Sequence, residues 1–156
     1  MAFVARRSLI VLATAAFAAA PAFAETPKRG APELAPVAAY VAKSTQKGTI
    51  DGKVARALGI SPKGTPMQLT AVVTAYMDGS RGAHLVSTPQ GQMLLFSQGK
   101  GNNGSWLLAN QAGALVRAVS WVPTSANPAP MDAKASGPLF TETKAFWKSQ
   151  LGTPVR

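Results

Sequence analysis

The sequence predicts an α+β domain built around an antiparallel sheet. Two observations carry this prediction. Residues 67–122 hold five short apolar runs separated by polar, glycine-bearing turns, and the segments before and after them show apolar residues at helical spacing. We therefore expect a five-stranded antiparallel meander with two short N-terminal helices and a C-terminal helix packed on one face.

Residues 1–24 are predicted to form a secretory signal peptide. Arg6 and Arg7 precede an alanine-rich apolar run, and Ala22 and Ala24 supply the small residues that a signal peptidase reads. The run is shorter than the ~20 residues of a spanning helix, so we expect cleavage after Ala24 rather than a transmembrane anchor. The expected location is the periplasm, with a peripheral position at the membrane left open. Unfolded export is the favoured route, and twin-arginine export remains an alternative.

Cleavage would leave 132 residues, which suits one domain at residues 37–156 after a proline-rich, flexible lead-in at residues 25–36. Cysteine is absent from the sequence. Disulfides, thiolate metal sites and cysteine nucleophiles are therefore excluded, and the domain must be stabilised by packing.

The two N-terminal helices are predicted at residues 36–45 and 51–58. Pro36 suits a first helical turn, Asp51 can cap the second helix, and Gly59 can end it. The strands are predicted at residues 68–77, 83–87, 92–98, 105–109 and 114–122. The third strand is apolar on both faces and so is expected at the centre of the sheet, after a tight turn at residues 89–91.

Residues 123–138 hold four prolines and are predicted to be irregular. A C-terminal amphipathic helix is expected at residues 141–151, with Thr141 as its cap. Lys144 and Lys148 would lie on its outer face. Trp147 has two interpretations: it fills the core between helix and sheet, or it contacts a partner beside the two lysines.

Charge is the strongest compositional signal. Without Arg6 and Arg7 the chain has 14 basic and 6 acidic residues, a net charge of +8. Such a charge favours an anionic partner: an acidic protein, lipid headgroups or an envelope polymer, with nucleic acid made improbable by export. No basic run in the mature chain is longer than a pair, so any basic patch must be assembled by folding. The candidate partner-binding or anion-binding residues are Lys100, Arg117, Lys144, Trp147 and Lys148.

The residues of catalysis are scarce. Residues 99–104 match G-x-G-x-x-G, but a strand-like segment follows where a dinucleotide site needs a helix, so we expect a hairpin loop that at most holds a small anion at Lys100. His84 is the single histidine, with Asp78 nearby in sequence, and no G-x-S-x-G motif marks a nucleophile. No metal site and no cofactor are expected.

By elimination, the sequence favours an exported, non-catalytic accessory protein that docks on a larger envelope protein or complex. A helper subunit of a membrane-associated respiratory dehydrogenase would be one example. The first alternative is a binder of anionic lipid or envelope polysaccharide through a basic surface. The second is a small hydrolase that uses His84.

Overall fold

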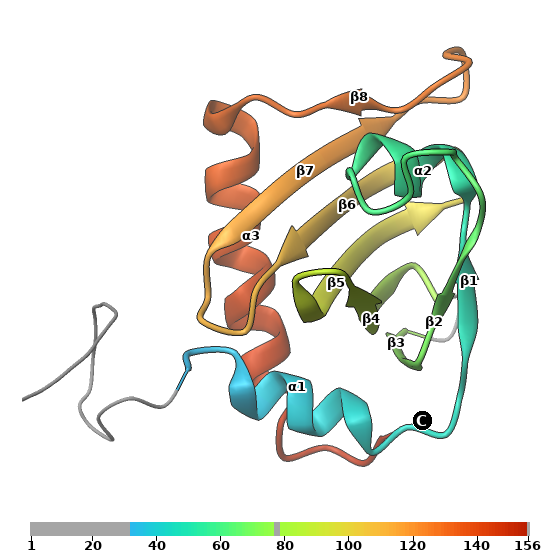
Figure 1. Ribbon diagram of the computed structural model, residues 1–156. Coiled ribbons are helices and arrows are strands. Elements are labelled where there is room, and N and C mark those ends of the chain that lie inside the picture. Colours follow the sequence, from blue (N-terminus) through green and yellow to red (C-terminus); the bar gives the residue numbers. More distant parts are fainter. Residues whose placement is uncertain (1–31, 77–78, 156) are drawn as a thin grey trace, which may run out of the picture. The chain divides into compact units, whose positions relative to one another are not determined.

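The computed structural model describes residues 32–76 and 79–155. The predicted signal peptide, residues 25–31 of the lead-in and Asp78 lie outside these residues. In the described part, a six-stranded antiparallel sheet runs in the order β3-β4-β5-β6-β7-β8 (Figure 1). The α+β class and the meander are therefore confirmed, with six strands in place of five. The strands are β3 (Ala71–Ala75), β4 (Arg81–Thr88), β5 (Gly91–Lys100), β6 (Asn103–Ala109), β7 (Leu115–Trp121) and β8 (Ala129–Pro130).

The predicted first strand is divided into two strands that belong to different sheets. β2 (Met67–Leu69) pairs with β1 (Gly48–Ile50) in a two-stranded sheet, whereas β3 pairs with β4. The amide of Thr70, between β2 and β3, donates to the carbonyl of Leu85 at 2.9 Å. The alternation of side chains continues through Thr70, so the sequence pattern carried no sign of this division.

The eighth strand lies in the proline-bearing segment that was predicted to be irregular. β8 pairs with Val119 and Ser120 at the edge of the sheet. Proline is tolerated at such an edge because its missing N–H faces away from the ladder.

The C-terminal helix begins earlier than predicted. α3 spans Ala133–Ser149, and its cap is Asp132 rather than Thr141: the Asp132 carboxylate accepts from the amide of Ala135 at 2.8 Å. Pro138 lies inside the helix. Because proline usually ends or kinks a helix, its presence displaced the predicted start.

The two short N-terminal helices are present with slightly different bounds. α1 spans Ala35–Ala42, and α2 spans Gly52–Ala57 with Asp51 as its cap, as predicted; its carboxylate accepts from Lys53 N at 2.7 Å. The predicted lead-in ends at Pro36, whereas Leu34 is already fully buried.

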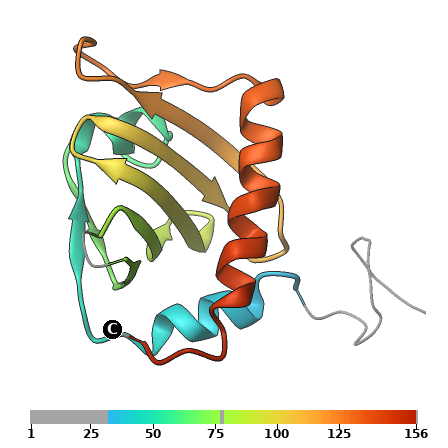
Figure 2. The same ribbon diagram turned by 180° about the vertical axis from the view of Figure 1, so that it is seen from behind.

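The six-stranded sheet separates two apolar clusters. One lies between the sheet and helices α1 and α3; the other lies between the opposite face and α2 with β1 and β2. Figure 2 shows α3 crossing the sheet on the face away from α2. β5 contributes to both clusters, Leu94 and Phe96 to the first and Met93 and Leu95 to the second, as expected for a central strand. Among the described residues, no helix combines the length and apolar character needed to cross a bilayer.

Candidate functional site

The four described carboxylates are all used within the fold. Glu33 and Glu142 form ion pairs, and Asp51 and Asp132 cap helices. The described residues hold eleven lysines and arginines, and three of these, Arg81, Lys144 and Lys148, take part in the ion pairs. The other eight have no carboxylate partner in the part of the chain that the structure describes.

Lys144 and Lys148 are bound to the N-terminal part of the fold. Their Nζ atoms lie 3.2 Å and 2.6 Å from Glu33 Oε2. Burial alone would raise the pKa of Glu33, but the hydrogen bonds and charges of the two lysines lower it below its usual value. Lys144 also donates to the Gly113 carbonyl at 3.4 Å. The predicted outer-face pair therefore ties α3 to the start of α1 and to the turn after β6.

Trp147 belongs to the core, which corrects its inclusion among the partner-binding candidates. Its side chain is 1 % exposed and packs in the cluster between α3 and the sheet. The core-filling interpretation of Trp147 holds, and Phe140 is buried in the same cluster. Trp106 and Trp121, by contrast, pack against the cluster on the α2 side.

Arg117 lies on the α2 side of the sheet with three further unpaired cations. It is paired in register with Leu108, a member of the cluster under α2, so both side chains point to that face. A Cβ placed on Gly59, just after α2, would lie 3.6 Å from the Arg117 guanidinium carbon. We call this surface the basic face; it comprises the exposed residues Lys53, Arg56, Lys63 and Arg117.

Neighbouring groups lie close to two of these cations. Lys53 donates to the Ala126 carbonyl at 2.9 Å, and its Nζ lies 5.9 Å from the centre of the Trp121 ring. The aliphatic part of Arg56 lies close to Gly64 in the loop that also carries Lys63. The sequence predicted a basic patch assembled by folding and identified Arg117, but it did not identify the cations of α2 and its loop.

Lys100 lies at a tight hairpin. β5 extends to Lys100, which is paired with Asn103 at the start of β6. The G-x-G-x-x-G segment is thus a hairpin between two antiparallel strands, as predicted, and offers no helix N-terminus to a dinucleotide. Lys100 is exposed and has no carboxylate partner among the described residues.

His84 lies at a cavity of about 270 Å³ between the sheet and α2. Its Nε2 is 2.9 Å from Ser97 Oγ, and its buried Nδ1 has no partner among the described residues. Burial lowers the pKa of His84 to about 4, so the imidazole is neutral at pH 7. Gly82 leaves space for the His84 imidazole, since a Cβ at Gly82 would lie 2.6 Å from that ring. The sequence suggested Asp78 as the partner of His84. It gave no indication of Ser97, which lies beside His84 because β4 and β5 pair as a hairpin.

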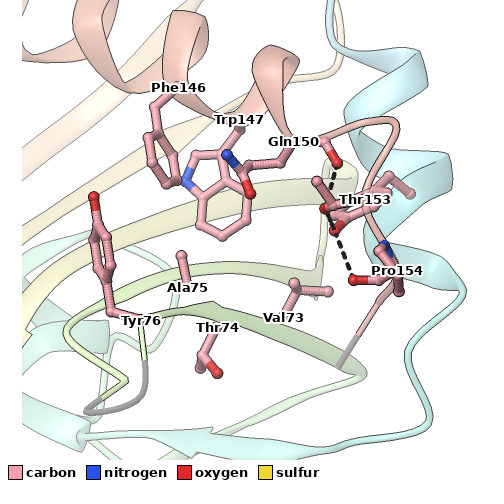
Figure 3. Close-up of a pocket in the computed structure, with 10 residues that line it drawn as sticks. Val73, Thr74, Ala75, Tyr76, Phe146, Trp147, Gln150, Thr153 and Pro154 are labelled. Carbon is pink, nitrogen blue, oxygen red and sulfur yellow. Dashed lines mark hydrogen bonds between the residues drawn. The ribbon is translucent and has the colours of Figure 1, made fainter.

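A second cavity of about 220 Å³ opens beside β3, the edge strand of the sheet. Figure 3 shows its labelled lining, with Tyr76 and Phe146 on one side and Val73 and Ala75 below. Tyr76 has a φ of 67° and is 59 % exposed. Such a backbone conformation is strained in a bulky residue. We call this cavity the edge pocket; the sequence gave no sign of it.

No known protein family, curated protein or solved structure matches the chain. In residues 32–76 and 79–155, no group of three or more histidine, cysteine or acidic residues comes together as a metal site would require.

Proposed function

We propose that this chain is an exported, non-catalytic accessory protein that docks on an acidic surface of a larger envelope protein through the basic face. The observation that carries the proposal is the distribution of charge. The described carboxylates are used in caps and ion pairs, while Lys53, Arg56, Lys63 and Arg117 gather around α2 without carboxylate partners.

The composition of the basic face favours a protein partner. Trp121 lies beside Lys53, and tryptophan and arginine are the residues that most often dominate the binding energy of protein interfaces. A hydrogen bond to the Ala126 carbonyl already restrains Lys53. Restrained side chains lose less conformational entropy on binding, which favours affinity. A membrane-associated respiratory dehydrogenase is one type of complex in which such a helper subunit would serve.

The test is a pull-down of the tagged mature protein from its own envelope extract, at low and then moderate salt. The variant Lys53→Glu/Arg117→Glu reverses two charges on the basic face. Its control, Lys43→Glu/Lys134→Glu, makes the same change of net charge at two exposed cations elsewhere. We expect a defined partner to be retained by the wild type and the control and lost by the basic-face variant. Equal retention by all three proteins, or equal loss by both variants, would refute docking through this face.

An anionic lipid or polysaccharide is the alternative ligand of the same face. It predicts recovery of lipid or polymer rather than protein, and binding that weakens steadily as salt rises. Anionic vesicles and the same pair of variants distinguish it from protein docking.

A small hydrolase is the second alternative, and the 2.9 Å contact of Ser97 Oγ with His84 Nε2 favours it. Two features oppose it. A base with a pKa of about 4 removes a proton weakly at neutral pH, and no described carboxylate orients Nδ1. A hydrolase would lose an esterase or amidase activity in both Ser97→Ala and His84→Ala while staying folded.

A further inference from the structure

The edge pocket combines aromatic walls with a backbone N–H and a backbone carbonyl, both of Thr74, that no described strand pairs with. Phe146 is fixed from three sides: Arg81 stacks on its ring at 4.2 Å, Tyr76 lies 6.0 Å away centre to centre, and Trp147 makes an edge-on contact at 5.2 Å. Arg81 is itself paired with Glu142 at 3.1 Å. The wall formed by Phe146 and Tyr76 is therefore held in place before any ligand arrives.

The backbone of β3 faces the pocket with one free donor and one free acceptor. The N–H of Val72 donates to the Gln46 carbonyl, and its carbonyl accepts from Ser44 Oγ at 2.6 Å, so both groups of Val72 point away from β4. Residues two apart in an antiparallel strand direct their backbone groups to the same side. The N–H and carbonyl of Thr74, which lines the pocket, therefore also point away from β4, toward the open edge of the sheet.

Side chains add further polar groups. The indole Nε1 of Trp147 is buried and has no acceptor among the described residues, and the amide of Gln150 lines the same pocket. One end of the pocket is closed by Tyr40 and Thr153, whose hydroxyl oxygens lie 2.9 Å apart. The residues that line the pocket carry no charged side chain.

We infer that the edge pocket binds one neutral sugar ring that carries an acetamido group, as in N-acetylglucosamine. The apolar face of a pyranose stacks on an aromatic wall, here Tyr76 and Phe146. The N–H and carbonyl of Thr74 point to the same side, whereas those of a trans acetamido group point in opposite directions. The acetamido carbonyl would therefore accept from the Thr74 N–H, and a neighbouring ring hydroxyl would donate to the Thr74 carbonyl. Its methyl group can lie on the apolar floor formed by Val73 and Ala75. The volume of about 220 Å³ is below the roughly 300 Å³ at which pockets for drug-sized molecules begin, so one ring fits.

The geometry disfavours the other ligands of an aromatic pocket. A cationic ligand finds no carboxylate in the lining, and the positive charge of Arg81 on one face of the Phe146 ring would repel it. An extended peptide needs several consecutive free residues at a sheet edge. Here Val72 is already bonded to Gln46 and Ser44. Tyr76 leaves the extended conformation, and its carbonyl accepts from the amide of Gly79. Thr74 is therefore a single extended residue whose N–H and carbonyl both lack a partner among the described residues.

The experiment is a titration followed by ¹⁵N NMR, in which the backbone amide of Thr74 and the indole N–H of Trp147 are observed. Trp106→Phe and Trp121→Phe assign the indole signals without altering the pocket. N-acetylglucosamine is added to ~20 mM, a range suited to a weak single-ring site. We expect both signals to move, and glucose at the same concentration to move neither.

Tyr76→Ala removes the exposed half of the wall without removing a buried side chain, and we expect it to weaken binding about tenfold. Val116→Ala, at an exposed apolar residue of β7 that does not line the pocket, is the matched control and should bind as the wild type does. Gln150→Ala, a second variant of the lining, should also weaken binding. The inference is overturned by unmoved signals, by an equal response to glucose, or by a stronger response to an acetylated dipeptide.

A free saccharide and a cell-wall glycan share this chemistry. Sedimentation with insoluble glycan that is lost in Tyr76→Ala identifies the polymer as the source. Binding of the soluble sugar without sedimentation identifies a free saccharide, and both results support the site. The pocket lies beside α3 and the basic face beside α2, so failure of one proposal leaves the other standing.

Discussion

Mild acid, between about pH 6.5 and 4, is expected to weaken this domain through His84. His84 is the only histidine in the chain and is 9 % exposed. Burial lowers its pKa in the folded state from 6.5 to about 4. Between these two values the unfolded chain binds a proton that the folded chain does not. Above pH 6.5 the imidazole is neutral in both states, so its protonation does not reduce the free energy of unfolding. As the pH falls from 6.5 toward 4, the free energy of unfolding decreases.

The size of the effect follows from the two pKa values. At pH 5 the unfolded imidazole is almost fully protonated and the folded one is neutral, which costs about 2 kcal/mol. The loss approaches about 3 kcal/mol as the pH reaches the folded pKa. A domain of this size has roughly 5–15 kcal/mol of stability in total, so the change is large.

The assay is urea unfolding followed by tryptophan fluorescence at a series of pH values from 8 to 5. His84→Gln, which keeps a hydrogen-bonding group near Ser97, is the control. The quantity compared is how the stability of this variant changes with pH, not its stability at any one pH. We expect the wild type to lose about 2 kcal/mol over this range and the variant to lose much less. A wild type equally stable at both ends, or a folded His84 that titrates near 6.5 by NMR, would refute the reasoning.

Two further predictions concern the backbone and an ion pair. Gly99→Ala should lower the free energy of unfolding by about 2 kcal/mol or more, because Gly99 has a φ of 96° and a Cβ would collide with the Asn103 carbonyl. The control is Gly152→Ala, where an added Cβ would meet no neighbouring group within 4 Å. It should change stability by less than about 0.5 kcal/mol in the same denaturation assay. Glu33→Gln should lower stability by less than about 1 kcal/mol at pH 7, since its side chain is 40 % exposed and solvent screens the pairs with the lysines of α3. Because the pKa of Glu33 is lowered, its contribution is present above the unfolded pKa and is lost as the pH falls through the folded one. A difference from the wild type that persisted at pH 2 would contradict this assignment.

Secondary structure could be predicted from the sequence where it depends on a short local pattern. The turn at residues 89–91, the cap at Asp51 and the apolar residues on both faces of β5 each follow from a few neighbouring residues, and each is found in the structure. β1 and β8 were not predicted because each is very short. β1 is held by pairing with β2, which is distant in sequence, and β8 by pairing with β7 at the edge of the sheet. Pro138 shows the converse case, since a local rule placed a boundary that the Asp132 cap and burial of Phe140 override.

The candidate sites were less predictable because they depend on register and on packing between distant segments. Composition indicated an anionic partner. Only the fold reveals that Lys144 and Lys148 are paired with Glu33, whereas Arg117 has no carboxylate partner among the described residues. Ser97 reaches His84 because β4 and β5 pair in one register; a shift of one residue would send the two side chains to opposite faces.

The ion pairs between described side chains lie on the α3 side of the sheet, and this bears on how the protein could act. On the α3 side, Arg81, Lys144 and Lys148 are paired with glutamates, and these pairs help to hold α3 and Phe146 in place. The lining of the edge pocket itself carries no charged side chain. On the α2 side the carboxylate of Asp51 caps a helix and the cations stay available to an acidic partner. Reversal of charge on the basic face should therefore leave the NMR response of Thr74 to sugar unchanged, because coupling between sites needs an element with two arrangements, and a packed sheet separates these two.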